Sequence, residues 1–201
     1  MSILDFPDAA PDGAQWALAP RTQRHEGELD GTVQTSGLPG TKWRATLTYG
    51  RRKGAKARLL RGFLVALDGE AGRFRLFPHD ARTPAGTALG APVVSGAGQT
   101  GGTLTVAGFT PNQPGALLAG DYFQIGSELK MLTADADVDA GGAATLTFKP
   151  ALRSSPAAGA AIVTTDPCAV MKLVDDNQAA WAASTPDWYA LAISCEEALD
   201  L

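Results

Sequence analysis

The sequence predicts a mainly β protein: a belt-like β-sandwich domain with one packed α-helix, interrupted by an inserted small β-barrel or sandwich domain. Three observations lead to this prediction. Short segments with alternating apolar and polar residues recur along the chain, separated by turns rich in glycine and proline. A single segment has helical spacing instead. The strand-like segments near the C-terminus are too few to fold alone, so we expect them to complete an earlier domain.

The N-terminal region predicts an extended arm followed by paired strands. We expect the arm in Met1 to Pro20, and strands at Gly31–Gln34 and Thr41–Tyr49. The intervening Ser36-Gly37-Leu38-Pro39-Gly40 is typical of a turn. Apolar residues alternate with polar ones along the second strand, which predicts one buried face. These apolar residues are Trp43, Ala45, Leu47 and Tyr49.

The next segment predicts a helix at about residues 54–67, because its apolar residues recur at spacings of three and four. The stripe consists of Ala57, Leu60, Leu64 and Leu67, and Leu59 and Phe63 widen it. Asp68-Gly69 is expected to end the helix. The alternating residues Arg73–Phe77 then predict a strand that Pro78 closes.

Residues 81–166 predict the inserted domain. The stretch Ala81–Gly101 has little patterning and is expected to be a linker or loose loop. Short strands follow at regular spacing, as in a small barrel or sandwich. The expected strands are Gly102–Phe109, Asp121–Gly126, Glu128–Thr133, Ala143–Phe148 and Ala160–Thr164. The second and third are expected to form a hairpin through Gly126-Ser127.

The C-terminal region predicts only two strands, Ala169–Val174 and Tyr189–Glu196. Because two strands are too few for an independent domain, we expect them to complete the first one. The predicted organisation is therefore a discontinuous domain of residues 1–80 and 167–201, and an inserted domain of residues 81–166.

Composition argues against several function classes. The net charge of the 201 residues is −4, whereas nucleic-acid binding requires a basic face. No apolar run approaches the about 18–20 residues of a membrane span, and the acidic N-terminus is unlike a signal peptide. Cys168 and Cys195, with His25 and His79, provide little for a zinc site or histidine catalysis. We expect reduced cysteines, no cofactor, no metal and no catalytic residue.

Charge is divided along the chain. Ten of the 17 basic residues lie between Lys42 and Arg75, whereas acidic residues dominate beyond Thr165. Opposite charges of this kind pair within a fold or between neighbouring copies. The candidate assembly residues are Arg51, Arg52, Lys53, Lys56, Arg58, Arg61, Asp175, Asp176, Glu196 and Glu197. For the basic run, a solvated helix face or a contact with phosphate are the alternatives.

Two stretches have a superficial likeness to ligand-binding motifs. Asp135, Asp137 and Asp139 are spaced like ligands of a calcium loop, but the twelfth position of such a loop falls at Leu146, so a solvated turn is favoured. The run Gly96–Gly102 is followed by a strand pattern and not by a helix, which argues against a nucleotide-binding loop.

Two further regions carry a family resemblance. The first comprises Gln15–Leu18, Gly40–Leu47 and the predicted helix with the strand after it; the second comprises Leu118–Gly126, Ala140–Leu146 and Lys149–Arg153. In these regions the chain resembles the distal tail proteins of long-tailed, non-contractile bacteriophages. The resemblance implies a belt-like domain with a barrel, and a hexameric ring that joins the tail tube protein to the tail-tip hub protein. It implies a virion protein at the tail tip, made in the host bacterial cytoplasm, without catalytic residues.

Two alternatives remain open. In the first, the inserted domain binds a carbohydrate or a host-surface receptor. Its available aromatic residues are Phe109, Tyr122, Phe123 and Phe148, and their alternation places some of them in the core. In the second, the protein is a cell-wall-degrading hydrolase that uses Asp121 and Glu128. Such an acid pair must face a cleft at a defined separation.

Overall fold

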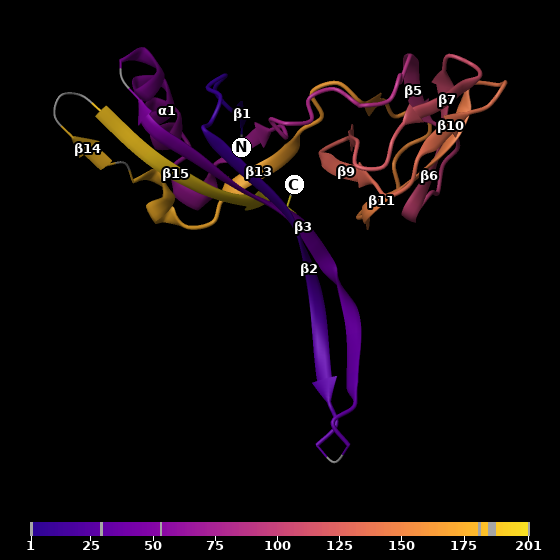
Figure 1. The fold of residues 1–201 in the computed structure, drawn as a ribbon, viewed down its shortest axis with the longest axis horizontal. Coiled ribbons are helices and arrows are strands. Elements are labelled where there is room, and N and C mark those ends of the chain that lie inside the picture. The colour runs from indigo at the N-terminus through magenta and orange to yellow at the C-terminus, as the bar shows by residue number, and fades with distance from the viewer. Residues whose placement is uncertain (1, 29, 53, 181, 185–187, 201) are drawn as a thin grey trace. The chain divides into compact units, whose positions relative to one another are not determined.

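The fold is described from a computed structural model of the full chain, which describes residues 2–28, 30–52, 54–180, 182–184 and 188–200. The chain divides into two compact units (Figure 1), and each is described by itself. Unit 1 comprises Met1–Arg73 with Met171–Leu201, and unit 2 comprises Phe74–Val170. The mainly β class with one α-helix is confirmed for the described residues.

Unit 1 contains most of one seven-stranded sheet, to which both chain ends contribute; two of the strands cross the unit boundaries, so residues 74–76 and 169–170 of the sheet fall in unit 2. Its strand order is β1 (Ile3–Asp5), β4 (Arg73–Leu76), β13 (Ala169–Leu173), β15 (Trp188–Glu197), β3 (Val33–Arg52) and β2 (Gly13–Glu26), and β14 (Ala182–Ser184) pairs with β15. The C-terminal strand β15 lies between β3 and β13, so the tail completes the sheet that the N-terminal strands begin.

The alternation along β3 is confirmed, because its predicted inward residues are buried. Trp43, Ala45, Leu47 and Tyr49 are each at most 2% exposed. The neighbouring strand β15 buries Ile193 and Cys195 in the same core. Both cysteines of the chain are free, and burial raises the pKa of the Cys195 thiol to about 12.

The predicted helix is confirmed as α1 (Ala55–Ala66), which follows β3 almost directly. It buries Ala57, Leu60, Phe63 and Leu64. The ring of Phe6 packs edge-to-face on Phe63, with ring centroids 5.1 Å apart. Leu59 was expected to widen the buried stripe, but it is 54% exposed, because the stripe is centred on Leu60 and Leu64 and position 59 lies beside it.

The predicted turn at Ser36–Gly40 is wrong, since β3 runs through it without a break. The pairing of β2 with β3 shifts between Ala19↔Lys42 and Arg21↔Leu38, so the extra residues of β3 form a bulge. Gly40 lies in this bulge with a φ of 103°, a conformation that favours glycine. Proline and glycine here mark an irregularity in a strand and not its end.

The extended arm is also misplaced in the prediction. Most of the expected arm, Met1 to Pro20, is instead sheet structure in β1 and β2. The β2–β3 hairpin turns further along the chain, where Gly27 N–H donates to the Thr32 carbonyl over 2.8 Å. The sequence pattern does not predict this outer hairpin. Polar residues lie on both of its faces, so neither face shows the alternation that marks a half-buried strand.

Unit 2 is a six-stranded antiparallel sheet that is nearly closed into a barrel, in agreement with the predicted inserted barrel. Its strand order is β12 (Ile162–Val163), β8 (Tyr122–Ile125), β9 (Glu128–Leu132), β11 (Ala143–Leu152), β6 (Gly101–Phe109) and β5 (Gly90–Val94). A bridge between Val93 and Ala161 brings the two edges together. Strands β7 (Gln113–Leu117) and β10 (Ala136–Val138) form a separate pair.

The barrel core confirms the predicted hairpin and corrects the predicted linker. Strands β8 and β9 pair with Ile125 opposite Glu128, as expected for a turn at Gly126-Ser127. Strand β5 lies inside the stretch that was expected to be a loose loop, and its Val94 is only 2% exposed. The rings of Phe123 and Phe148 meet edge-to-face in the core at 5.3 Å.

Candidate assembly surfaces

The outer half of the β2–β3 hairpin is a two-stranded arm, defined here as residues 21–38. Its strands pair with each other from Arg21↔Leu38 to Glu26↔Val33. Strand β15 pairs with β3 only from Arg44 onward, so no other described strand supports the arm. Every described residue from Arg21 to Gly37 is exposed (Figure 1). An isolated two-stranded ribbon of this kind is only marginally stable in water.

The arm ends in an acidic tip, defined as Glu26, Glu28 and Asp30. All three are exposed. Arg24 pairs with Glu26 at 2.9 Å, but both side chains are about 60% exposed, so the pair is weak. The backbone N–H of Thr32, and then its hydroxyl, donate to Asp30 and hold the pKa of that carboxyl below its usual value. The tip therefore carries a net negative charge at neutral pH.

Helix α1 presents a basic outer face, defined as Lys56, Arg58 and Arg61. Lys56 and Arg58 are exposed. A shallow hollow of about 400 Å³ lies on this face, lined by Arg58, Arg61, Gly62 and Val65. Gly62 leaves the hollow open because it has no side chain, and Val65 is 66% exposed beside it. Two cations, Arg58 and Arg61, thus line the hollow together with Gly62 and Val65.

The remaining basic candidates of the sequence prediction are Arg51, Arg52 and Lys53. The first two residues end β3. Their side chains, and Lys53 entirely, lie outside the described residues. The basic outer face is therefore discussed from α1 alone.

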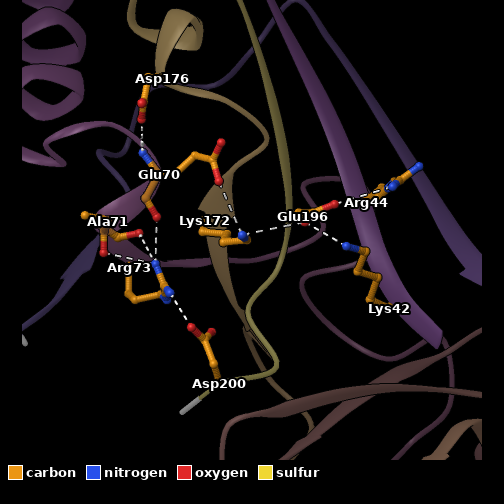
Figure 2. A network of polar contacts seen from close by, with 10 residues as sticks. Lys42, Arg44, Glu70, Ala71, Arg73, Lys172, Asp176, Glu196 and Asp200 are labelled. Atoms are coloured by element: carbon orange, nitrogen blue, oxygen red, sulfur yellow. Dashed lines mark hydrogen bonds and ion pairs between the residues drawn. The ribbon is translucent and has the colours of Figure 1, made fainter. Parts of the chain in front are cut away.

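The acidic candidate Glu196 lies among three cations within unit 1 (Figure 2). Its carboxylate is 2.7 Å from Lys42 Nζ, 3.5 Å from Arg44 Nη2 and 3.9 Å from Lys172 Nζ. Burial by itself raises the pKa of Glu196. The hydrogen bond and charge of Lys42, with the charges of Arg44 and Lys172, outweigh burial and lower this pKa below its usual value.

The other acidic candidates also make contacts within unit 1. The Trp43 N–H donates to Glu197 over 3.1 Å, and Glu197 is 1% exposed. Asp175 accepts from the Asn177 N–H at the start of the 3-10 helix η2 (Asp176–Ala179), and Asp176 accepts from the Glu70 N–H over 2.9 Å. These contacts tie strands and loops of unit 1 together.

The contacts around Glu196 continue into a polar network, whose second part is formed by Arg73 near the C-terminal tail (Figure 2). Its guanidinium donates to Asp200 over 2.7 Å. It also donates to the carbonyls of Glu70, Ala71 and Gly72, at 2.8 to 3.1 Å, around the 3-10 helix η1 (Gly69–Ala71). Lys172 connects the two parts, since its Nζ lies 3.5 Å from Glu70. The network anchors the tail on the sheet.

Sequence reasoning missed the cations of this network and the acidic tip. Lys42 and Arg44 alternate on the polar side of β3, but their approach to Glu196 depends on cross-strand register, which a sequence does not provide. The tip did carry a signal. Asp30-Gly31 is a dipeptide typical of hairpin turns, and recognising it would have placed the turn correctly.

The proposed acid pair of unit 2 is engaged in contacts that hold loops. Asp121 accepts the backbone N–H groups of Ala85, Gly86 and Leu118 at 2.8 to 3.3 Å. Glu128 lies 2.6 Å from Lys130 Nζ. Glu128 lines a cavity of about 220 Å³ whose lining does not include Asp121. The geometry thus offers no support for these two acids acting on one substrate.

The three aspartates with calcium-like spacing cap backbone groups. Asp135 accepts from the Ala119 N–H and Asp137 from the Gly115 N–H. Asp139 accepts from the N–H groups of Gly141 and Ala143, within its own turn. Among the described residues, no group of three His, Cys, Asp or Glu side chains is placed to hold a metal ion.

The aromatic residues of unit 2 are mostly inside the barrel. Phe109, Phe123 and Phe148 are 4%, 0% and 1% exposed, as their alternation predicted in part. Tyr122 is half-buried, and burial, with the charge of Asp80, raises its pKa. These three phenylalanines are therefore not available as a stacking platform for a sugar.

The class of this protein is defined by its fold and its surfaces. No protein-family model matches the chain, and no curated protein matches it either. None of the helices in the described part of the chain is long and apolar enough to span a membrane. The molecule belongs to a class of mainly β proteins with a barrel-like unit and, on its other unit, an exposed β arm.

Proposed function

We propose that this protein is a structural component of a bacteriophage tail, and that its copies form a ring at the tail tip between the tail tube and the hub. The observation that carries this proposal is the exposed two-stranded arm of residues 21–38. A two-stranded ribbon with no apolar face gains little stability by folding alone. Its length provides a surface that a neighbouring chain can contact. The family resemblance of the sequence supplies the tail-tip context.

The edges of the sheet in unit 1 support the same proposal. Strand β2, with 14 residues, is one edge strand and the short strand β1 is the other. A long edge strand presents unpaired backbone N–H and C=O groups, which natural monomers normally cover or shorten. In a ring of identical copies, each edge is covered by the next chain. Six copies, a tube protein and a hub protein are the partners that the proposal includes.

Native mass spectrometry of the full chain over a range of concentrations tests this proposal. We expect a single closed oligomer, with six copies, to replace the monomer as concentration rises. An open series of oligomers would contradict a closed ring. A monomer at every concentration, together with absence of the chain from purified phage particles, would overturn the proposed function.

A further inference from the structure

Opposite charges lie at the two ends of a single strand. Strand β3 begins with Val33 next to the acidic tip and ends with Arg52 just before α1. At about 3.3 Å per residue, its 20 residues span about 60 Å. The acidic tip and the basic outer face of α1 therefore cannot pair within one copy. A second copy offers each surface a partner of opposite charge.

We propose that the acidic tip of one copy docks on the basic outer face of α1 in the next copy. This inference rests on the proposed function, because it names the surfaces that join the ring. The contact is heterologous: it uses a different surface on each partner, so each copy still has a tip or a helix face with which to contact a further copy. Repetition of such a contact closes a ring when the rotation between copies allows it.

The two surfaces match in chemistry as well as in charge. Glu26 and Glu28 face solvent at the tip, and Lys56 and Arg58 face solvent on the helix. Val33, 47% exposed beside the tip, has an apolar counterpart in the hollow that Val65 and Gly62 line. An apolar centre with charges around it is the usual anatomy of a specific interface.

The arm is long enough to carry the tip to a neighbour. Ala17 pairs with Arg44, the last residue of β3 that β15 supports, and from there β2 extends about 30 Å to Glu26. The two strands pair along the arm from Arg21 to Glu26, and the described residues there are exposed. The outer face of α1 is likewise exposed, so neither surface must unfold to dock.

Charge reversal tests the contact. The variant Glu26→Lys with Glu28→Lys, or the variant Lys56→Glu with Arg58→Glu, should raise the concentration needed for oligomers by about tenfold or more, because like charges then meet. Combining all four changes restores opposite charges and should return assembly to within about threefold of the original chain. Asp8→Lys with Asp80→Lys is the control, since it changes charge equally on exposed residues outside both surfaces. Each variant should keep the melting temperature of the original chain.

Cysteine cross-linking tests the geometry independently. In a Cys168→Ser background, Glu28→Cys and Leu59→Cys on the same chain should give disulfide-linked species beyond the dimer, as a head-to-tail contact requires. Each single variant alone should give none, and a mixture of the two should stop at the dimer. Oligomers that form normally without cross-links, and that tolerate charge reversal, would overturn this contact and leave the ring standing. A chain that never oligomerises would overturn both proposals.

Discussion

Glu196 is the residue on which the strands and charges of unit 1 converge. Its carboxylate contacts Lys42 and Arg44 from β3 and Lys172 from β13. Glu196 is 9% exposed and the side chains of Lys42 and Lys172 are about a quarter exposed, so these two contacts are screened less than surface pairs. The acidic tail that looked free in the sequence is thus used to join neighbouring strands.

Replacing Glu196 with glutamine should lower the free energy of unfolding by about 1–2 kcal/mol at neutral pH, because three cations lose their carboxylate. The native pKa lies below the usual 4.5, so the carboxylate contributes stability above about pH 4.5 and loses it as pH falls through the lower native value. Denaturant unfolding of both chains from neutral to acidic pH measures this. A difference between them that stays constant on acidification would contradict the expectation.

Lys130 is the fully buried cation of the barrel. Its Nζ lies 2.6 Å from Glu128 and donates to the Ala151 carbonyl over 2.9 Å. Lys130→Met should cost about 3–5 kcal/mol, since it leaves the Glu128 carboxylate buried without its closest cation. Lys149→Met is the control, because Lys149 is exposed on β11. The double variant with Glu128→Gln should cost less than the sum of the single changes; additive costs would show that the two side chains act separately.

At the scale of elements, the barrel depends on a close backbone approach at the turn before β11. Gly142 has a φ of 77°, and a Cβ there would lie 2.5 Å from the Phe109 carbonyl oxygen. Gly98 has the same φ of 77° but no atom within 4 Å of a Cβ.

Substituting each of these two glycines distinguishes the cost of a positive φ from the cost of steric crowding. Both Gly142→Ala and Gly98→Ala impose a positive φ on alanine, which costs about 1 kcal/mol. Only Gly142→Ala also forces β6 and the turn apart, so it should lower the free energy of unfolding by about 1–3 kcal/mol more than its control. Thermal and denaturant unfolding measure this difference. Equal effects would contradict the close approach.

The elements that the sequence predicts are those with one buried face. Trp43, Leu47 and Tyr49 alternate because one side of β3 is core, and Leu60 and Leu64 recur because one side of α1 is core. The outer hairpin has no buried face, so periodicity carries no signal there. At its base, Pro39-Gly40 resembles a turn, although β2 pairs with β3 on both sides of the bulge there.

At the scale of the whole molecule, charge segregation has two uses that a sequence cannot distinguish. The predicted basic surface exists on α1 at Lys56 and Arg58, but the expected acidic partners Glu196 and Glu197 already make contacts inside unit 1. Strand register brings acids of β15 beside cations of β3, and register depends on long-range packing. Three of the exposed acids, Glu26, Glu28 and Asp30, lie together at the tip of the arm, one strand length from α1.

We propose that the whole molecule is a scaffold that functions by assembly. Its two units supply a sheet with open edges and a barrel. In the proposed ring, each copy contacts one neighbour through its arm and the other neighbour through the outer face of its α1. A mass measurement counts the copies but does not place them in a particle.

An electron-microscopy map of phage particles that contain this chain decides whether it has the proposed role at a tail tip. We expect a closed ring of this chain at the tail tip, between tube and hub, with each arm extending onto α1 of its neighbour. Density for the chain elsewhere in the particle, or its absence from the particle, would contradict the claim.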